Sequence, residues 1–359
     1  LDGSGFKLVT EGSEGYLGGW AISSDGSKIY YLMYNPDENY ATELWRANSN
    51  GTGKTRIYRS PSEQWLYKWL VSPDGQKVAF VSYGYYYEGY CLFVMNSDGS
   101  NLLQLTKANL SNSEIDWSSD STEIVYTSAT YNFAALMKIG IRNTGLARGA
   151  TGQDYNSFRY LDWSPDGTRI LFVNKRTTDT IATINSAGGD YTVLAEVYPP
   201  EDVQAVAYSP DGTKILYETH YGEEEWGEGQ QNVYVMDANG QNRIKLWFST
   251  MTYSCAWSGD SKKIIFSNYE DIFTINPDGT GKTNLTNNTL PLASVCPKLS
   301  ASGTKVVYGQ IKITNERPAY ELVSANADGT SPQVIYSTSG WMMLAELKPL
   351  AWAPHDLSL

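Results

Sequence analysis

Apolar and polar residues alternate in short segments along the whole chain, and no stretch follows a helical period. Segments 77–81 and 169–173 are rich in β-branched and aromatic residues, which favour strands. After a loop of variable length, a further apolar segment follows in each unit, such as 92–96 or 233–237. The pattern therefore predicts an all-β protein.

Tight turns separate these segments in a fixed order. A first turn, Ser-Pro-Asp-Gly at 164–167, lies between two segments, and a second, Asn-Ser-Asp-Gly at 96–99, precedes a short last segment. Proline presets φ near −65°, and glycine accepts the positive φ that a tight hairpin turn requires. The order predicts four strands in each unit.

The serine that opens the first turn recurs along the chain. The copies begin at Ser23, Ser72, Ser118, Ser164, Ser209, Ser258 and Ser300. Successive serines lie 42 to 49 residues apart, as their numbers show, and such a period indicates one supersecondary unit used repeatedly. Four-stranded units of this size are the blades of a β-propeller. We expect the aromatic residues before the first turns to pack between blades. These are Trp117, Trp163, Tyr208, Trp257 and Trp352.

The ends of the repeat leave the number of blades open. Residues 6–10 look like an outermost strand and residues 350–354 like a first strand, each without the rest of a unit. We predict seven blades with the termini meeting at the closure, and the alternative is an eighth, incomplete blade. Exchange of strands between the termini would protect exposed sheet edges. Because the repeat runs without a linker, residues 1–359 are predicted to form a single domain.

The charge of the chain argues against two classes of partner. The net charge is −12, and lysine and arginine are dispersed rather than clustered. Nucleic acids and anionic membranes are bound by basic patches, so we expect neither. No apolar run is long enough to span a membrane. Leu1 opens the chain without the features of a signal segment, so we expect any targeting segment to have been removed or never present.

The cysteines and acidic residues offer little metal chemistry. Cys255 and Cys296 fall on first strands of neighbouring units, where they either bridge two blades or serve as small buried hydrophobes. Zinc is not expected, because the chain has no Cys-x-x-Cys and only two histidines. The glutamates at 223–225 and Glu228 form either a Ca²⁺ site or a solvated acidic loop, and the loop is favoured because the usual Asp spacing is absent. No cofactor is predicted.

The repeat resembles that of the TolB-like β-propeller family, whose consensus is Trp-Ser-Pro-Asp-Gly. Residues 163–167 match all five positions, whereas the copies at 118–121 and 258–261 have serine in place of the glycine that follows the aspartate. In the blade topology, both turns fall on one face (the turn face) and the variable loops on the other (the loop face). The resemblance implies that partners dock on the loop face or at the mouth of the axial channel.

Aromatic residues gather in and beside the segments predicted as loops of the loop face. Tyrosine and tryptophan supply rigid contact area with a polar tip, which suits recognition of sugars or protein surfaces. The alternative is that these rings pack against each other to order long hairpin loops. The candidate binding residues are Tyr34, Tyr40, Tyr83, Tyr85, Tyr86, Tyr87, Tyr90, Tyr221, Trp226, Trp65 and Tyr155.

Polar residues just before the first turns form a second candidate site. Asp116, Asp162 and Lys298 stand two residues before the turn serine, and Glu114 stands two residues earlier in its unit. If the neighbouring aromatic residue faces the next blade, these four side chains should face the axial channel. There they either bind water or a cation, or simply line a water-filled channel.

Catalysis has little support in the sequence. There is no Gly-x-Ser-x-Gly elbow, so the peptidase module of related prolyl-oligopeptidase-type enzymes is not expected. Related propellers that cleave pectic oligosaccharides use histidine-rich metal sites, which two histidines do not offer. We predict a non-catalytic propeller, periplasmic, extracellular or at the cell surface, that binds a protein or a glycan. The alternatives are a polysaccharide-acting hydrolase or lyase with carboxylates at the channel mouth, and a structural subunit of a surface layer or filament.

Overall fold

The structure is a computed structural model of the chain. It describes residues 16–22, 28–35, 41–48, 52–61, 64–84, 89–106, 114–130, 133–141, 146–151, 157–221, 230–249, 254–268, 270–288, 292–299, 305–312 and 319–339. All regular secondary structure in these ranges is β-strand, as the sequence predicts. Within the same ranges, no helix is long and apolar enough to cross a membrane.

The strands form four-stranded antiparallel sheets, each built from consecutive strands of the chain. The first strands are β1 (Tyr16–Ile22), β5 (Gln64–Val71), β9 (Ile115–Trp117), β13 (Ser157–Trp163), β17 (Glu201–Tyr208), β21 (Ser254–Trp257) and β25 (Leu292–Leu299). The second strands are β2 (Lys28–Asn35), β6 (Lys77–Gly84), β10 (Glu123–Thr130), β14 (Arg169–Lys175), β18 (Lys214–Tyr221), β22 (Ile264–Ser267) and β26 (Lys305–Lys312). The third strands are β3 (Ala41–Asn48), β7 (Gly89–Asn96), β11 (Phe133–Gly140), β15 (Asp179–Asn185), β19 (Gln230–Asp237), β23 (Ile272–Ile275) and β27 (Ala319–Asn326). The fourth strands are β4 (Thr55–Arg59), β8 (Leu103–Gln104), β12 (Leu146–Thr151), β16 (Thr192–Val197), β20 (Ile244–Ser249), β24 (Thr283–Asn284) and β28 (Gln333–Ser339).

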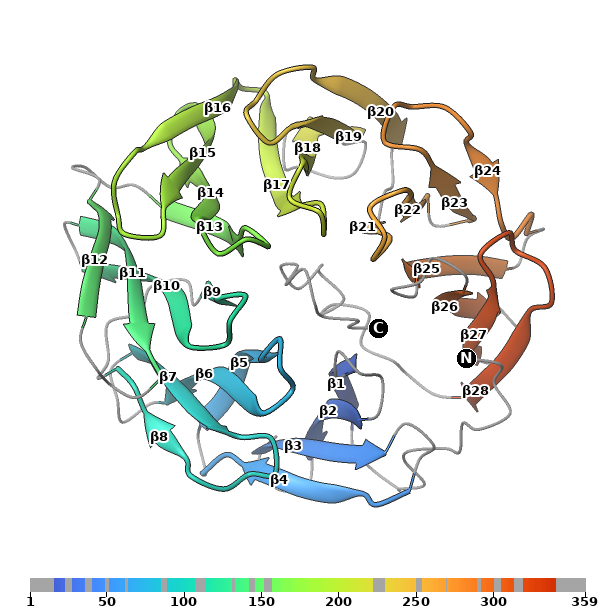
Figure 1. Ribbon diagram of the computed structural model, residues 1–359. Helices are drawn as coiled ribbons and strands as arrows, with labels where there is room; N and C mark the ends of the chain where they lie inside the picture. The colour runs from blue at the N-terminus through green and yellow to red at the C-terminus, as the bar shows by residue number, and fades with distance from the viewer. Residues whose placement is uncertain are drawn as a thin grey trace.

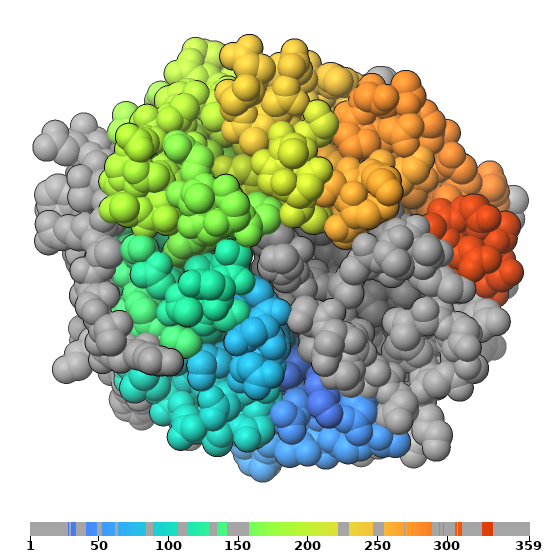
Figure 2. Space-filling model, in the orientation of Figure 1, coloured from blue at the N-terminus to red at the C-terminus, as the bar shows by residue number. Residues whose placement is uncertain are grey.

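The sheets surround a central axis, as Figure 1 shows. The first strand of each sheet lies nearest the axis, and the fourth strand lies at the rim. The colours of the described atoms follow the chain around the molecule, so neighbouring repeats lie side by side (Figure 2). This is the arrangement of a β-propeller, and each four-stranded sheet is one blade.

The first turn is held by a repeated set of hydrogen bonds. In the copy at 164–167, the Ser164 hydroxyl donates to Asp166 Oδ1 over 2.6 Å and accepts from the Arg169 amide over 2.9 Å. Asp166 Oδ1 also accepts from the Thr168 amide over 3.0 Å. The hydrogen bond from Ser164 is the largest cause that lowers the pKa of Asp166. Gly167 has φ of 73°, which confirms the left-handed conformation expected from the sequence.

Two copies of this turn have serine at the position of Gly167 and keep the left-handed backbone conformation there. Ser121 and Ser261 both have φ of 60°, a region that costs free energy for residues other than glycine. Each of these serines also joins two blades, because its hydroxyl accepts a hydrogen bond from the turn of the preceding blade. The donors are the amides of Asp74, at 3.1 Å from Ser121 Oγ, and Asp211, at 3.0 Å from Ser261 Oγ.

The glycines of the second turn press against the preceding blade. A Cβ added to Gly240 would lie 2.7 Å from the Leu194 carbonyl oxygen, and one added to Gly99 would clash with the Ile57 carbonyl. Both glycines also have positive φ, 83° and 89° respectively. Backbone therefore contacts backbone at these points, and only glycine fits both requirements.

Aromatic residues before the first turns fill the seams between blades. Trp117, Trp163, Tyr208 and Trp257 are at most 4% exposed, which confirms their predicted packing role. Trp117 lies in one apolar cluster with Leu70 of the preceding blade, and its Nε1 donates to the Leu70 carbonyl over 3.3 Å. Trp352 lies outside the described residues.

Cys255 is buried and is not part of a disulfide bond. The predicted alternative of a bridge to Cys296 is therefore wrong, and Cys255 fills the seam as a small side chain. Its Sγ lies 2.6 Å from Oε1 of the buried Glu218 on the preceding blade.

Candidate binding face

The register of the strands defines two faces of the molecule. In the sheet β5–β8, Gln64 pairs with Gly84 and Gly84 with Gly89 at one edge, which is the loop face. Lys77 pairs with Asn96 at the opposite edge, beside both turns, which is the turn face. Side chains at the start of first strands and at the end of second strands therefore share the loop face.

Four aromatic side chains meet at the loop face of the sheet β5–β8. We call Trp65, Tyr67, Tyr83 and Tyr90 the aromatic quartet. Trp65 and Tyr83 are register partners, and their rings are nearly parallel, at 17°, with centroids 6.5 Å apart. Tyr83 and Tyr90 are also register partners, with centroids 4.9 Å apart. The quartet is thus a cross-strand cluster on one side of the sheet.

A β-bulge brings the fourth ring into the quartet. The register of β5 against β6 shifts between Leu66 and Lys68, which leaves Tyr67 without a strand partner. A bulge re-aims the extra side chain. The ring of Tyr67 meets the edge of Tyr90, with centroids 5.3 Å apart.

The quartet has a buried base and an exposed top. Tyr90 is partly buried and packs against the apolar cluster that contains Trp117. Trp65, Tyr67 and Tyr83 are 38%, 61% and 37% exposed. Burial raises the pKa of Tyr90, and the neighbouring Tyr67 and Tyr83 raise it further, so the three phenol groups are electrostatic neighbours.

A line of polar residues runs beside the quartet along the first strands. Lys68 and Glu114 each stand four residues before a turn serine, and they form an ion pair over 3.0 Å between two blades. Their side chains are only 8% and 15% exposed. Tyr160 occupies the same position in the next blade with φ of 55°, and burial, followed by the charge of Glu114, raises its pKa to about 12.

A charged cluster on the loop face joins the next two blades. Lys175 Nζ lies 2.6 Å from Asp179 Oδ2 and 3.3 Å from Asp202 Oδ2. His220 Nδ1 lies 3.7 Å from Asp202 Oδ1, and the Tyr160 ring centroid lies 5.9 Å from Lys175 Nζ. Because Asp202 and His220 keep 46% and 29% of their side chains exposed, this cluster is accessible to solvent.

Asp116 and Asp162 lie in the seams between blades. Asp116 Oδ2 accepts from the Trp163 amide over 2.7 Å, and Asp162 Oδ2 accepts from the Tyr208 amide over 2.6 Å. They are 1% and 0% exposed, so neither carboxyl group is open to solvent, and a role for them in an axial channel stays a prediction. Each carboxyl group fastens its blade to the next, since a buried carboxyl group needs such a partner.

The environment of Asp162 opposes its ionisation. Burial is the main cause, and the charge of Asp116 adds to it, so the pKa of Asp162 lies well above its usual range. The hydrogen bond from the Tyr208 amide acts in the opposite direction and is the smaller effect.

The repeat matches the sequence model of a known protein family. The family model for the TolB beta propeller domain matches residues 1–226, more than half of the chain. The chain belongs to the TolB β-propeller family. No curated protein sequence gave a significant match.

Solved structures with this fold are distant in sequence. A prolyl endopeptidase has 11% identity and a TM-score of 0.68 over 92% of this chain, which spans 50% of that enzyme's chain. An oligogalacturonate lyase in complex with manganese has 12% identity and a TM-score of 0.61, over 86% of this chain and 89% of the other. The β-propeller domain of the Trilobed protease from Pyrococcus furiosus has 13% identity and a TM-score of 0.62, over 94% of this chain and 99% of the other. Identities this low support the fold alone.

The structure brings together only some of the predicted binding residues of this TolB-family chain. Trp65, Tyr83 and Tyr90 form the quartet, and Tyr221 is 49% exposed at the loop-face end of β18. The following predicted residues lie outside the described residues: Tyr40, Tyr85, Tyr86, Tyr87, Tyr155, Trp226, the glutamates 223–225 and Glu228. For Tyr34 and Lys298 the backbone is described and the side chain is not.

Sequence reasoning missed the charged partners on the loop face. Lys68 stands four residues before Ser72, as Glu114 does before Ser118, so alignment of the repeats could have paired them. The cluster of Lys175, Asp202 and His220 had no such signal, because it depends on the contact between two blades.

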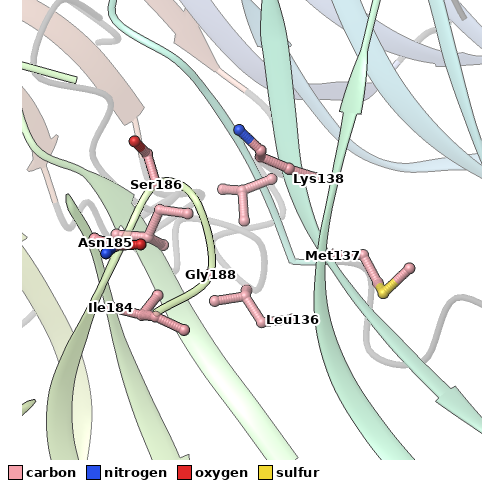
Figure 3. A pocket seen from close by; sticks show the side chains of 9 residues that line it. Leu136, Met137, Lys138, Ile184, Asn185, Ser186 and Gly188 are labelled. Carbon is pink, nitrogen blue, oxygen red and sulfur yellow. The ribbon is translucent and has the colours of Figure 1, made fainter. Parts of the chain in front are cut away.

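A small hollow lies elsewhere, in the seam between β11 and the turn that joins β15 to β16 (Figure 3). Its lining is mainly aliphatic, and its one charged residue, Lys138, pairs with Glu123 over 2.9 Å. The turn at 185–188 places it on the turn face, away from the quartet. Among the described residues, no group of three or more His, Cys, Asp or Glu side chains is placed to hold a metal ion.

Proposed function

We propose that this TolB-family propeller is a non-catalytic binding module that recognises a protein or a glycan through its loop face. The observation that carries the proposal is the aromatic quartet, with Trp65, Tyr67 and Tyr83 between 37% and 61% exposed. Exposed aromatic area loses the free energy that burial would supply, and clustered exposure of this kind marks interaction sites. Periplasmic or cell-surface location belongs to the proposal.

The anchoring of the quartet supports recognition over simple ordering of a loop. Tyr90 is fixed against the core, and the cross-strand register fixes Tyr83 and Trp65 in turn. Rings that are already ordered lose little conformational entropy when a ligand binds, so the same contact area yields more affinity. The contact among the rings and the binding role are therefore compatible.

The blade architecture that presents this face is proposed as a single ring of seven blades over residues 1–359. The support is that the sheets β1–β4 and β25–β28 are each complete with consecutive strands. Such a ring closes by contact between two complete blades rather than by exchange of a strand. An experimental structure in which a terminal strand joins the opposite blade would contradict this closure.

A direct test compares two variants of the full chain on arrays of glycans and peptides. The double variant Trp65→Ala/Tyr83→Ala should lose binding to whichever ligand the parent binds. Tyr191→Ala is the control, because Tyr191 is 48% exposed beside the turn that joins β15 to β16, on the turn face. Equal loss in both variants, or loss in neither, would contradict a binding role for the quartet.

A polysaccharide-acting enzyme is the second candidate, and one observation favours it. Asp202 and His220 lie 3.7 Å apart and accessible, with Lys175 on the other oxygen of Asp202. A carboxylate close to a histidine is a common arrangement for proton transfer. Turnover on a polysaccharide panel that disappears in both His220→Ala and Asp202→Asn would favour this candidate. Absence of turnover in the parent would remove it.

A further inference from the structure

We infer that the aromatic quartet binds an uncharged pyranose chain, a neutral oligosaccharide, with the C–H faces of its sugars on Trp65 and Tyr83. The inference rests on the proposed function and narrows its ligand from two classes of macromolecule to one. Three features of the quartet support it: the arrangement of the rings, the hydrogen-bonding capacity of the phenol groups, and the charges near them.

The rings of Trp65 and Tyr83 provide a suitable surface for sugar rings. They lie on adjacent strands, nearly parallel at 17° and with centroids 6.5 Å apart. The face of an aromatic ring carries negative potential, and the C–H groups on one side of a pyranose are weakly positive and apolar. The two rings are stacked on neighbouring strands, and the exposed parts of Trp65 and Tyr83 (38% and 37%) can each contact part of one saccharide chain.

The phenol groups add the polar half of the recognition. Tyr67, Tyr83 and Tyr90 are electrostatic neighbours through their phenols, and no hydrogen bond joins these hydroxyls to another described side chain or backbone group. Each hydroxyl can both donate and accept. A pyranose presents hydroxyl groups around an apolar face, so it satisfies the rings and the phenols together. A purely apolar ligand would desolvate the phenols without replacing their bonds to water.

The charge around the quartet favours an uncharged sugar. Lys68 follows Tyr67 directly, but it is 7% exposed and its ammonium group is engaged by Glu114 over 3.0 Å. The chain as a whole carries a net charge of −12. A polyuronate would therefore gain no counter-charge from Lys68 and would meet net repulsion.

Exposure of the rings also disfavours a peptide. Aromatic anchors in protein–protein recognition gain most of their free energy in fully desolvated pockets near the centre of an interface. In the unbound chain, Trp65, Tyr67 and Tyr83 are between 37% and 61% exposed on a sheet surface and are not set in such a pocket. Sugars commonly bind with one face on a ring and the other in water, which this exposure permits.

The test uses the full chain and three sets of probes measured by calorimetry. The first set is the neutral hexaoses of β-1,4-glucan, β-1,4-xylan, β-1,4-mannan and α-1,4-glucan, the second is oligogalacturonate and the third is a displayed library of dodecapeptides. The variants are Trp65→Ala, the triple variant Tyr67→Phe/Tyr83→Phe/Tyr90→Phe, and Tyr191→Ala as the control. The triple variant keeps every ring, so it tests the phenols even if Trp65→Ala fails to fold.

We expect the parent to bind at least one neutral hexaose. Affinity should fall about tenfold or more in Trp65→Ala and about fivefold in the triple variant, and should not change in Tyr191→Ala. Failure of every neutral hexaose to bind the parent overturns the inference. Affinity that is unchanged in the triple variant overturns it as well.

Two outcomes separate this inference from the proposed function. If peptides or oligogalacturonate bind in a manner that requires Trp65, while neutral hexaoses do not bind, the sugar class is wrong and the binding function stands. If a ligand of any class binds the parent and Trp65→Ala equally, both the inference and the proposed role of the quartet fail.

Discussion

The turn face and the loop face of this propeller are built by the same strands and differ in how strictly they repeat. On the turn face, the bonds among Ser164, Asp166 and Thr168 recur almost unchanged in the copies that begin at Ser72 and Ser209. On the loop face, equivalent positions hold Lys68, Glu114 and Tyr160 in three successive blades. Repetition therefore follows the hydrogen bonds that shape the recurring first turn, whereas variation follows contacts that only one blade makes.

Substitution of a glycine in the second turn should lower stability more than substitution of a glycine in the first turn. Gly99→Ala should lower the free energy of unfolding by about 3 kcal/mol or more, because the new Cβ would strike the Ile57 carbonyl at a φ of 89°. Gly167→Ala should cost only about 1 kcal/mol, because the nearest atom, Ser119 Oγ, is 3.1 Å away and only the φ of 73° is unfavourable. Denaturant unfolding of both variants checks the difference, and equal costs would show that the second turn does not lock the seam.

On the loop face, the ion pair between Lys68 and Glu114 should contribute to stability in one seam. Lys68→Met should destabilise the protein by on the order of 3 kcal/mol, because it leaves Glu114 as an uncompensated, largely buried charge. The double variant Lys68→Met/Glu114→Leu should recover most of that loss, since no charge is then left without a partner. If the double variant is as unstable as the single one, the loss of stability does not come from the uncompensated charge of Glu114.

Asp162 and Asp166 lie four residues apart and should respond to pH in opposite ways. The pKa of Asp162 is raised in the folded state, so its contribution to stability is complete below the unfolded pKa and is lost as pH rises through the folded pKa. Asp162→Asn retains an acceptor for the Tyr208 amide, so it should gain stability relative to the parent as pH rises above about 4.

Asp166 provides the matched control in the same blade. Its pKa is lowered, so its contribution is present above the unfolded pKa and is lost as pH falls through the folded pKa. Asp166→Asn should therefore be less stable than the parent at neutral pH and should approach it in acid. Thermal unfolding of both variants between pH 3 and pH 8 checks the two signs, and parallel curves would contradict the seam assignment of Asp162.

The sequence predicted those features that depend on neighbouring residues. The positive φ of Gly167 and the burial of Trp163 could be predicted, because both follow from the turn residues and the strand period of two in their own segment. The orientation of Asp116 and Asp162 could not be predicted, because alternation along a strand does not tell whether a side chain faces the axis or the next blade. The quartet needed the register of β5 against β6, which the bulge at Tyr67 changes.

The free energy of unfolding of Trp163→Ala, measured beside that of Trp65→Ala, separates the residues that hold the fold from those that bind. Trp163 is 2% exposed in a seam, and its removal should cost about 3–5 kcal/mol. Trp65 is 38% exposed on the loop face, and its removal should cost less than about 1 kcal/mol of stability while lowering ligand affinity about tenfold or more. Comparable losses of stability in the two variants would contradict the division of this propeller into seams that hold the fold and a face that binds.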